Sequence, residues 1–346
     1  MGLFDDDLPA QDPAPSHQRK PKAARPVIAT VPAPELGELA GQLPAQLRLG
    51  TSSWSFPGWD GLIWDGAYSE AALAKSGLEA YARHPVLRTV SLDRAFYRPL
   101  SASQYAAYAA QVPDDFRFLV KAPSLVTDAL VRTADGRGMQ ANPAFLDAGL
   151  ACTEFIQPVI EGLGPKAGPL VFQISPLPDR WLLRMPELLQ RMAAMLAALP
   201  ALAPAAPGAV IAVEVRNREF LTPAFVDVLK TAGATFCLGL HPKMPPIEEQ
   251  LPVLRALWPA PLVCRWNLHG KHGAFGYEQA KGLYQPFDKL VDPDPHTRNQ
   301  LARVIAGTTG AGHAAYVTIN NKAEGSAPLS ALELARAVAA ARALRG

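Results

Sequence analysis

Charged and amide side chains stand at the ends of several apolar runs in this sequence. Lys121 ends one run, Gln173 stands near the end of another, and Glu214 and Arg216 end a third. Amines and guanidinium groups bind phosphates and carboxylates, and a carboxylate buried among such cations can act as a general acid or base. We therefore predict a site for an anionic small molecule, provided that the fold brings these residues together.

Three residues are predicted to take part in catalysis, and ten more to bind the ligand. Glu214 is the predicted general base or acid, His269 is its partner acid, and Lys121 is an amine that also helps to hold the anion. The predicted ligand-binding residues are Arg216, Arg265, Gln173, Asn320, Asn321, Thr51, Ser52, Trp54, Asp93 and Tyr97. We expect no cofactor and predict no metal ligand, because the neighbouring arginines and lysine disfavour a dication.

The spacing of these residues places several of them on one face of a strand. Glu214 and Arg216 are two residues apart, and the residues of the set Arg265, Asn267 and His269 follow one another at the same interval. Side chains two residues apart in a β-strand point to the same side. A polar set at the end of an otherwise apolar strand face is typical of a pocket mouth.

Each candidate also has a structural interpretation, which the sequence leaves open. Glu214 and Arg216 can neutralise each other as a buried pair, and Lys121 can be the partner of a carboxylate. Gln173 can satisfy backbone groups of a loop, and Trp54 can pack in the core.

The residues that position this set are eight apolar runs alternating with helical stretches. The predicted strands are 47–54, 87–93, 116–121, 169–174, 210–216, 235–240, 262–269 and 314–320. The predicted helices are 70–83, 101–111, 143–162, 180–199, 222–232, 247–257, 275–284, 296–307 and 328–345. Eight such repeats predict an α/β fold, a closed (β/α)₈ TIM-like barrel, whose chemistry lies at the carboxyl ends of the strands. The first run ends in 50–55 without the GxGxxG spacing of an open nucleotide-binding sheet.

The first 45 residues differ from the rest of the chain. They contain eight of the 34 prolines, an acidic cluster at 5–7 and a basic cluster at 19–25, and they show no hydrophobic period. Such a segment buries too little to offset its ordering entropy. We predict a flexible tail over 1–45 and a single barrel domain over 46–346.

Composition excludes several classes of protein. A hydrophobic share of 49% argues against overall disorder, and no run of about 18 apolar residues predicts a transmembrane helix. Three cysteines without a CxxC pair argue against a disulfide framework and fit a reducing, cytoplasmic location. A net charge of +2 gives no reason to expect a membrane or nucleic-acid partner, and the oligomeric state is left open.

Eight segments in order resemble the YecE-like family, which is also known as domain of unknown function seventy-two. They are GTSSWS at 50–55, FYRP at 96–99, FRFLVK at 116–121, GPLVFQ at 168–173, AVEVR at 212–216, RWNLHG at 265–270, INN at 319–321 and GSAP at 325–328. The resemblance implies a TIM-barrel-like fold and no particular reaction. The chain departs from the family pattern at Ser91, where a glutamate is usual, with Asp93 at the position of an asparagine.

Taken together, these features predict a small-molecule enzyme, an isomerase, lyase or hydrolase, with a pocket for a phosphorylated or carboxylated ligand. The alternative is a barrel without catalytic activity that binds a ligand, a nucleic acid or a protein.

Overall fold

The computed structural model describes residues 26–132 and 138–344 of the chain. Its centre is a closed barrel of eight parallel strands, in which each strand pairs with the next one along the chain and the last pairs with the first. The strands are β1 (Leu47–Thr51), β2 (Leu87–Leu92), β3 (Arg117–Lys121), β6 (Ala167–Gln173), β7 (Val210–Glu214), β8 (Thr235–Leu240), β9 (Leu262–Trp266) and β10 (Ala315–Ile319). All eight predicted strands exist, so the predicted TIM-like barrel is confirmed.

Three strands end at least two residues earlier than predicted, because the chain turns away from the barrel at their polar residues. β1, β7 and β9 end at Thr51, Glu214 and Trp266, two or three residues before the predicted ends. After β9, for example, the backbone N–H of His269 donates to the carbonyl of Lys322 (2.9 Å) instead of continuing the strand ladder.

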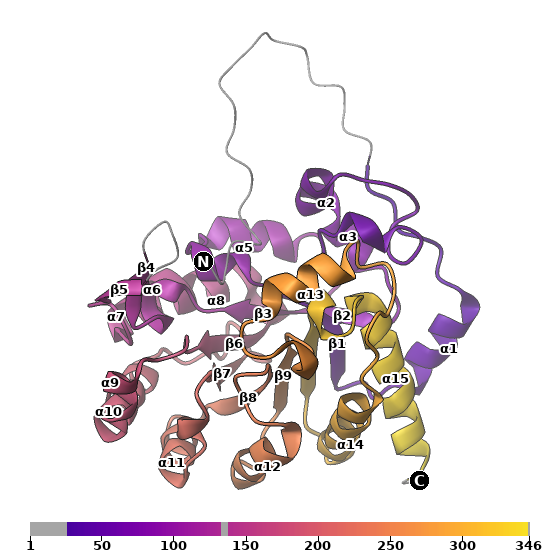
Figure 1. Cartoon of the computed structure of the whole chain (residues 1–346). Coiled ribbons are helices and arrows are strands. Elements are labelled where there is room, and N and C mark those ends of the chain that lie inside the picture. The colour runs from indigo at the N-terminus through magenta and orange to yellow at the C-terminus, as the bar shows by residue number, and fades with distance from the viewer. Residues whose placement is uncertain (1–25, 133–137, 345–346) are drawn as a thin grey trace, which may run out of the picture.

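Helices form an outer ring around the strands (Figure 1). They are α2 (Glu70–Ser76), α3 (Leu78–Tyr81), α4 (Arg94–Tyr97), α5 (Ala102–Ala109), α6 (Ser124–Thr127), α7 (Ala148–Ala151), α8 (Gln157–Leu163), α9 (Asp179–Leu182), α10 (Met185–Ala197), α11 (Pro223–Thr231), α12 (Ile247–Ala256), α13 (Tyr277–Tyr284), α14 (Pro295–Gly310) and α15 (Ala327–Ala343). Their starts follow the sequence chemistry, because the Ser101 hydroxyl accepts from the N–H of Gln104 and the Thr222 hydroxyl from that of Phe225.

A helix also forms where we predicted a flexible tail. Helix α1 (Pro34–Gln42) buries Leu39 against the core and lies beside α15. Before it, Ala29 forms a β-bridge with Trp64. The prediction was therefore wrong for residues 26–45, where packing supplies the stabilisation that a weak hydrophobic period did not reveal. Residues 1–25, the rest of the predicted tail, lie outside the described residues.

A short antiparallel hairpin, β4 (Leu130–Arg132) and β5 (Gly138–Ala141), lies between β3 and α7 and was not predicted. The helix predicted over 143–162 starts later, at α7, because the Asp147 carboxylate caps the N–H of Leu150 (2.8 Å). A π-helical segment, Cys152–Ile156, joins α7 to α8.

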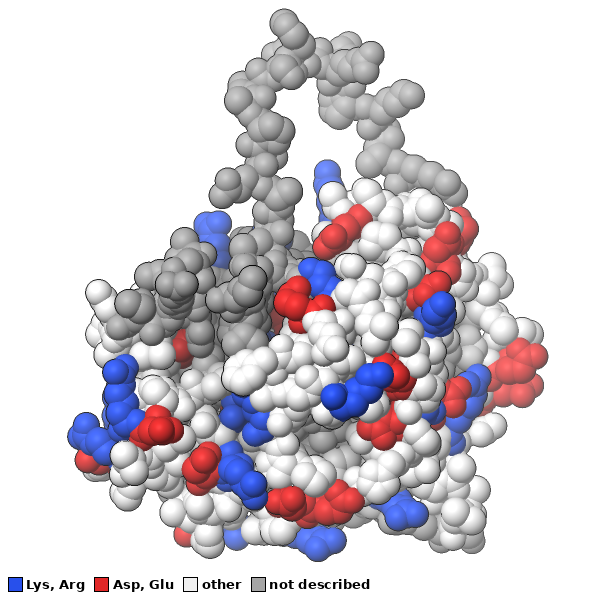
Figure 2. Space-filling model, in the orientation of Figure 1, with Lys and Arg blue, Asp and Glu red and all other residues white. Residues whose placement is uncertain are grey.

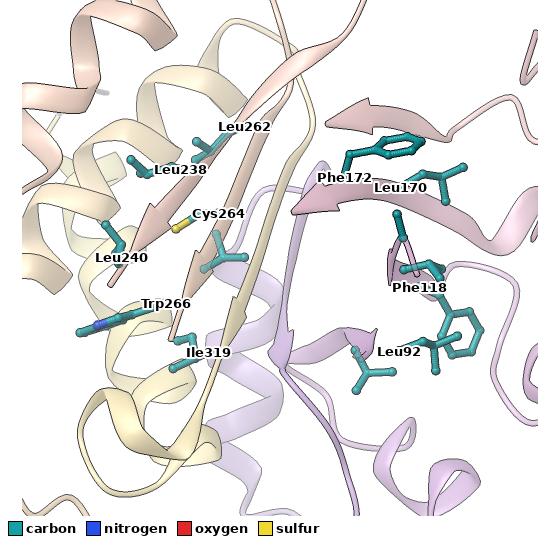
Figure 3. Packing of buried hydrophobic residues seen from close by; sticks show 14 of the residues in the cluster. Leu92, Phe118, Leu170, Phe172, Leu238, Leu240, Leu262, Cys264, Trp266 and Ile319 are labelled. Atoms are coloured by element: carbon teal, nitrogen blue, oxygen red, sulfur yellow. The ribbon is translucent and has the colours of Figure 1, made fainter. Parts of the chain in front are cut away.

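The strands carry two layers of side chains. Residues that face outwards belong to the main buried cluster, of which Figure 3 shows Phe118, Leu170, Phe172 and Leu238 among others. A separate interior cluster consists of Leu119, Val171, Ala212, Cys237, Val263 and Tyr316. Because strand side chains alternate, the next inward positions towards the carboxyl ends are Lys121, Gln173, Glu214, Gly239 and Arg265. A polar layer therefore lies on top of an apolar one.

Two further features concern the surroundings of the protein. The three cysteines, Cys152, Cys237 and Cys264, are all free, and the last two are buried. In the described ranges, none of the helices has the length and the apolar character that crossing a membrane requires. On the face shown in Figure 2, positive and negative side chains are interspersed.

Candidate functional site

Arg265 joins four strands of the barrel through its guanidinium group. Its Nη1 donates to Glu214 Oε2 (2.7 Å) and to Gln173 Oε1 (2.7 Å). Its Nη2 donates to Asp93 Oδ2 (3.0 Å) at the end of β2. The polar residues that we predicted from four separate strands therefore form one connected network.

Glu214 is the buried anion of this network. The residue is 0% exposed, and its Oε1 lies 2.5 Å from Arg216 Nη2. Burial alone would raise the pKa of this carboxyl, but Arg216 and Arg265 hold the pKa below its usual value. Gly239 on the neighbouring strand faces this group, and a Cβ there would lie in ordinary van der Waals contact with Glu214 Oε1 (3.4 Å).

Lys121 has a different environment from the two arginines. The residue is 6% exposed, and its Nζ lies 3.8 Å from the centre of the Phe96 ring. Burial lowers the pKa of Lys121 to about 8, which the charges of Asp93 and Glu214 offset only in part. Within the described part of the chain, Lys121 forms no ion pair.

Most of this network, though not Glu214, lines a pocket of about 880 Å³ at the carboxyl ends of the strands. We call Asp93, Lys121, Gln173, Arg216 and Arg265 the floor of this pocket. The lining includes six lysines and arginines but only two acidic residues: Lys121, Arg216, Lys243, Arg265, Lys281 and Lys322 against Glu70 and Asp93. The pocket is therefore lined mainly by positive charge.

Three of these cations, Lys243, Lys281 and Lys322, are named here the wall lysines. Lys322 Nζ lies 4.0 Å from the centre of the Tyr277 ring, and burial together with Lys322 lowers the pKa of Lys281. Sequence reasoning missed all three, because they lie in loops and in α13, beyond the strand ends that we searched.

Two predicted polar residues connect the wall to the first strand. Asn320 Nδ2 donates to Ser52 Oγ (2.9 Å) and to the Tyr277 hydroxyl (3.1 Å), and both Asn320 and Ser52 line the pocket. Tyr97 lines it as well.

His241 is a further lining residue, which we did not include among the predicted site residues because it precedes Pro242. Burial, followed by the charges of Arg216 and Lys243, lowers the pKa of His241 to about 2. Its imidazole is therefore neutral, and Nδ1 accepts from the backbone N–H of Lys243 (3.1 Å).

A family model described as "Protein of unknown function DUF72" matches residues 48–345. The chain belongs to the DUF72 family. This confirms the resemblance predicted from the sequence. The chain is similar to solved structures of two DUF72 family proteins. The one from Enterococcus faecalis V583 has 19% identity and a TM-score of 0.56 over 84% of this chain and 95% of that chain. The one from Thermotoga maritima MSB8 has 19% identity and a TM-score of 0.51 over 84% and 98%. A comparison with curated proteins found no match.

In this DUF72 protein, two predicted catalytic residues lie away from the pocket surface. His269 is not among the lining residues, and its Nδ1 caps the short helix Gly270–His272 by accepting from the N–H of Lys271 (3.1 Å). Glu214 lies beneath the floor. Neither Glu214 nor His269 is therefore at the pocket surface, where the predicted base and its partner acid would meet a ligand.

Three predicted ligand-binding residues of the DUF72 barrel also lie outside the lining, namely Thr51, Trp54 and Asn321. The Thr51 hydroxyl is bonded to the Tyr81 hydroxyl (2.8 Å), and the Trp54 indole donates to a backbone carbonyl of α2 (3.2 Å). Asn321 Oδ1 accepts from the Trp59 indole (3.2 Å). Their polar groups hold the loops that surround the pocket.

The site of this chain is therefore a pocket of cations and neutral donors, with Glu70 and Asp93 as its acidic residues. In the part of the chain that the structure describes, no three His, Cys, Asp or Glu side chains come together as a metal site.

Proposed function

We propose that this protein is an enzyme that acts on a small molecule carrying a phosphate or carboxylate group. The observation that carries the proposal is the excess of six cationic over two acidic side chains in a pocket of about 880 Å³. Arg216 adds to it, because its buried Nη1 has no hydrogen-bond partner among the described residues. An unsatisfied buried donor is costly, and an oxygen atom of a bound ligand would satisfy it.

The residues at and beneath the floor divide into two roles in this proposal. Arg265 and Glu214 are positioning residues, because their charges are spent on each other and on Gln173 and Asp93. Lys121 and Asp93 are the groups that can exchange protons with a ligand, since both line the pocket and the Asp93 side chain is 19% exposed. The reaction class stays an isomerisation, an elimination or a hydrolysis.

Thermal unfolding in the presence of anions tests the proposal. A ligand at a hundred times its Kd stabilises a protein by about 2.7 kcal/mol. This corresponds to about 4 °C for a barrel of about 300 residues, whose unfolding entropy is about 0.6 kcal/mol per kelvin. We expect a shift of this size with inorganic phosphate or with one of a set of phosphorylated and carboxylated metabolites.

The matched pair of variants is Lys281→Gln in the pocket and Lys230→Gln on the exposed surface of α11. We expect the first to reduce the shift and the second to leave it unchanged. No shift with any anion, or an equal shift in both variants, would count against the proposal. Binding without conversion of any bound metabolite would favour the barrel that only binds.

A further inference from the structure

We propose that Lys121 is a nucleophile that forms an imine with an aldehyde or ketone group of the ligand. This inference rests on the proposed function, because it assigns a second functional group, a carbonyl, to the same anionic ligand. Three observations support this inference: the location of the amine, the ion pairs that the neighbouring carboxylates form with arginines, and the amide N–H donor of Gln173 in the same pocket floor.

The amine of Lys121 lies inside the barrel mouth, where a ligand can reach it. Lys121 ends β3, occupies the inward position above Leu119, and lines the pocket. One side of its Nζ is covered by the Phe96 ring at 3.8 Å. A buried lysine in such surroundings is the residue type that forms imines with carbonyl compounds.

The two carboxylates that could form an ion pair with this amine, Asp93 and Glu214, are paired with arginines instead. Asp93 accepts from Arg265 (3.0 Å) and from the Ser91 hydroxyl (2.5 Å). Glu214 lies between Arg265 and Arg216. This separates the two interpretations that the sequence left open, because a structural lysine would be the ion-pair partner of one of these groups.

The free amine is populated near neutral pH. With a pKa of about 8, about one molecule in ten carries the neutral Lys121 amine at pH 7. An ordinary lysine is neutral in about one molecule in three thousand. The charged groups that act on Lys121 are Asp93, Glu214, Arg216 and Arg265, and all four belong to the network at or beneath the floor.

Gln173 is placed to receive the carbonyl oxygen. Its Oε1 accepts from Arg265 (2.7 Å) and from Arg216 (3.4 Å), which fixes the orientation of the carboxamide. Among the described residues, its Nε2 donates to no group, so this N–H is available to a ligand.

The step balances without an oxidant or a reductant. The neutral amine of Lys121 attacks the carbonyl carbon, and a C–N bond forms. The nitrogen then loses two protons, and the former carbonyl oxygen takes up two. The C–O bond breaks, this oxygen leaves as one water, and a C=N bond takes the place of the original C=O bond.

Reductive trapping tests the inference. Pyridoxal 5′-phosphate, a phosphorylated aldehyde, and glyoxylate, a carboxylated one, are each incubated with the full chain and reduced with borohydride. Peptide mapping by mass spectrometry then compares the secondary-amine adduct on Lys121 with that on Lys230, an exposed lysine that serves as the internal reference. We expect Lys121 to react at least tenfold faster, with a rate that rises with pH around a midpoint near 8.

Two variants complete the design. Lys121→Arg keeps the charge but cannot form the imine, so the fast adduct should disappear while the melting temperature shows that the barrel is folded. Lys281→Gln should slow the labelling of Lys121 by weakening anion binding. Equal labelling of Lys121 and Lys230 by both aldehydes would overturn the inference. If phosphate still stabilises the protein in that case, the proposed function stands without it; if no anion does, both fail.

Discussion

Replacing Arg265 by methionine tests whether the buried network holds the pocket floor together. The methionine side chain is shorter and apolar, and it makes none of the hydrogen bonds of Arg265 to Glu214, Gln173 and Asp93. Glu214, which is fully buried, then keeps Arg216 as its remaining ion-pair partner. The variant therefore leaves part of a buried negative charge without compensation.

The expected loss follows from the cost of breaking a buried ion pair, which is about 3–5 kcal/mol. Divided by an unfolding entropy of about 0.6 kcal/mol per kelvin for a barrel of about 300 residues, this becomes a decrease in melting temperature of about 5–8 °C. Calorimetry measures it directly. Urea unfolding supplies the free energy, provided that the slope of the transition is unchanged.

A double-mutant cycle with Glu214→Gln separates the interaction from other effects of the substitution. Because the two side chains are in contact, we expect the double variant to be more stable than the sum of the single losses by about 1–3 kcal/mol. The control is Glu79→Gln in the pair with Arg83, whose side chains are 63% and 66% exposed. This control should cost less than about 1 kcal/mol. A melting temperature of Arg265→Met within about 2 °C of the unmodified protein, or strict additivity in the cycle, would refute the reasoning.

Three further predictions concern single residues. The pKa of Lys121 is about 8 in the folded protein and 10.5 in the unfolded one, so at pH 7 the charged lysine destabilises the folded state and Lys121→Met should stabilise the protein by up to about 3 kcal/mol. Urea unfolding should show this gain disappearing as the pH rises from 8 to 10.5. The pKa of His241 is about 2 in the folded protein and 6.5 in the unfolded one, so the free energy of unfolding should decrease below pH 6.5, by about 2 kcal/mol at pH 5. His241→Asn should reduce this pH dependence in calorimetry, and an unchanged dependence of stability on pH would contradict the prediction. Gly58→Ala should lower the free energy of unfolding by at least about 2 kcal/mol, because the added Cβ would lie 1.8 Å from the carbonyl oxygen of Pro286. The control is Gly66→Ala, whose Cβ meets nothing within 4 Å, and equal melting temperatures of the two variants would contradict the prediction.

The barrel could be predicted because its strands are continuous apolar runs that end in polar residues. The inward pairs such as Leu119 with Lys121, or Val263 with Arg265, follow from the two-residue alternation of a strand. Helix α1 could not be predicted in this way. Few of its residues are buried, and its stability comes from contact with α15, nearly three hundred residues further along the chain.

The site was predicted only as far as the strands reach. The floor residues were found because they lie at strand ends, whereas His269 was misplaced because we extended β9 three residues beyond Trp266. A strand of that length would have pointed His269 into the barrel. The wall lysines belong to connections whose path depends on tertiary packing, and no local pattern indicates where such a path leads.

The charge balance of the floor indicates how a ligand is oriented in the proposed reaction. Arg216 and Arg265 offset Glu214 and Asp93, so Lys121 contributes the only surplus charge of this network. An anion placed on the floor would favour the ammonium form of Lys121, raise its pKa and remove the nucleophile. The anionic group therefore belongs at the wall lysines, with the carbonyl at the floor. Inorganic phosphate should accordingly leave the pH midpoint of Lys121 labelling near 8, and a midpoint displaced upwards by phosphate would contradict this orientation.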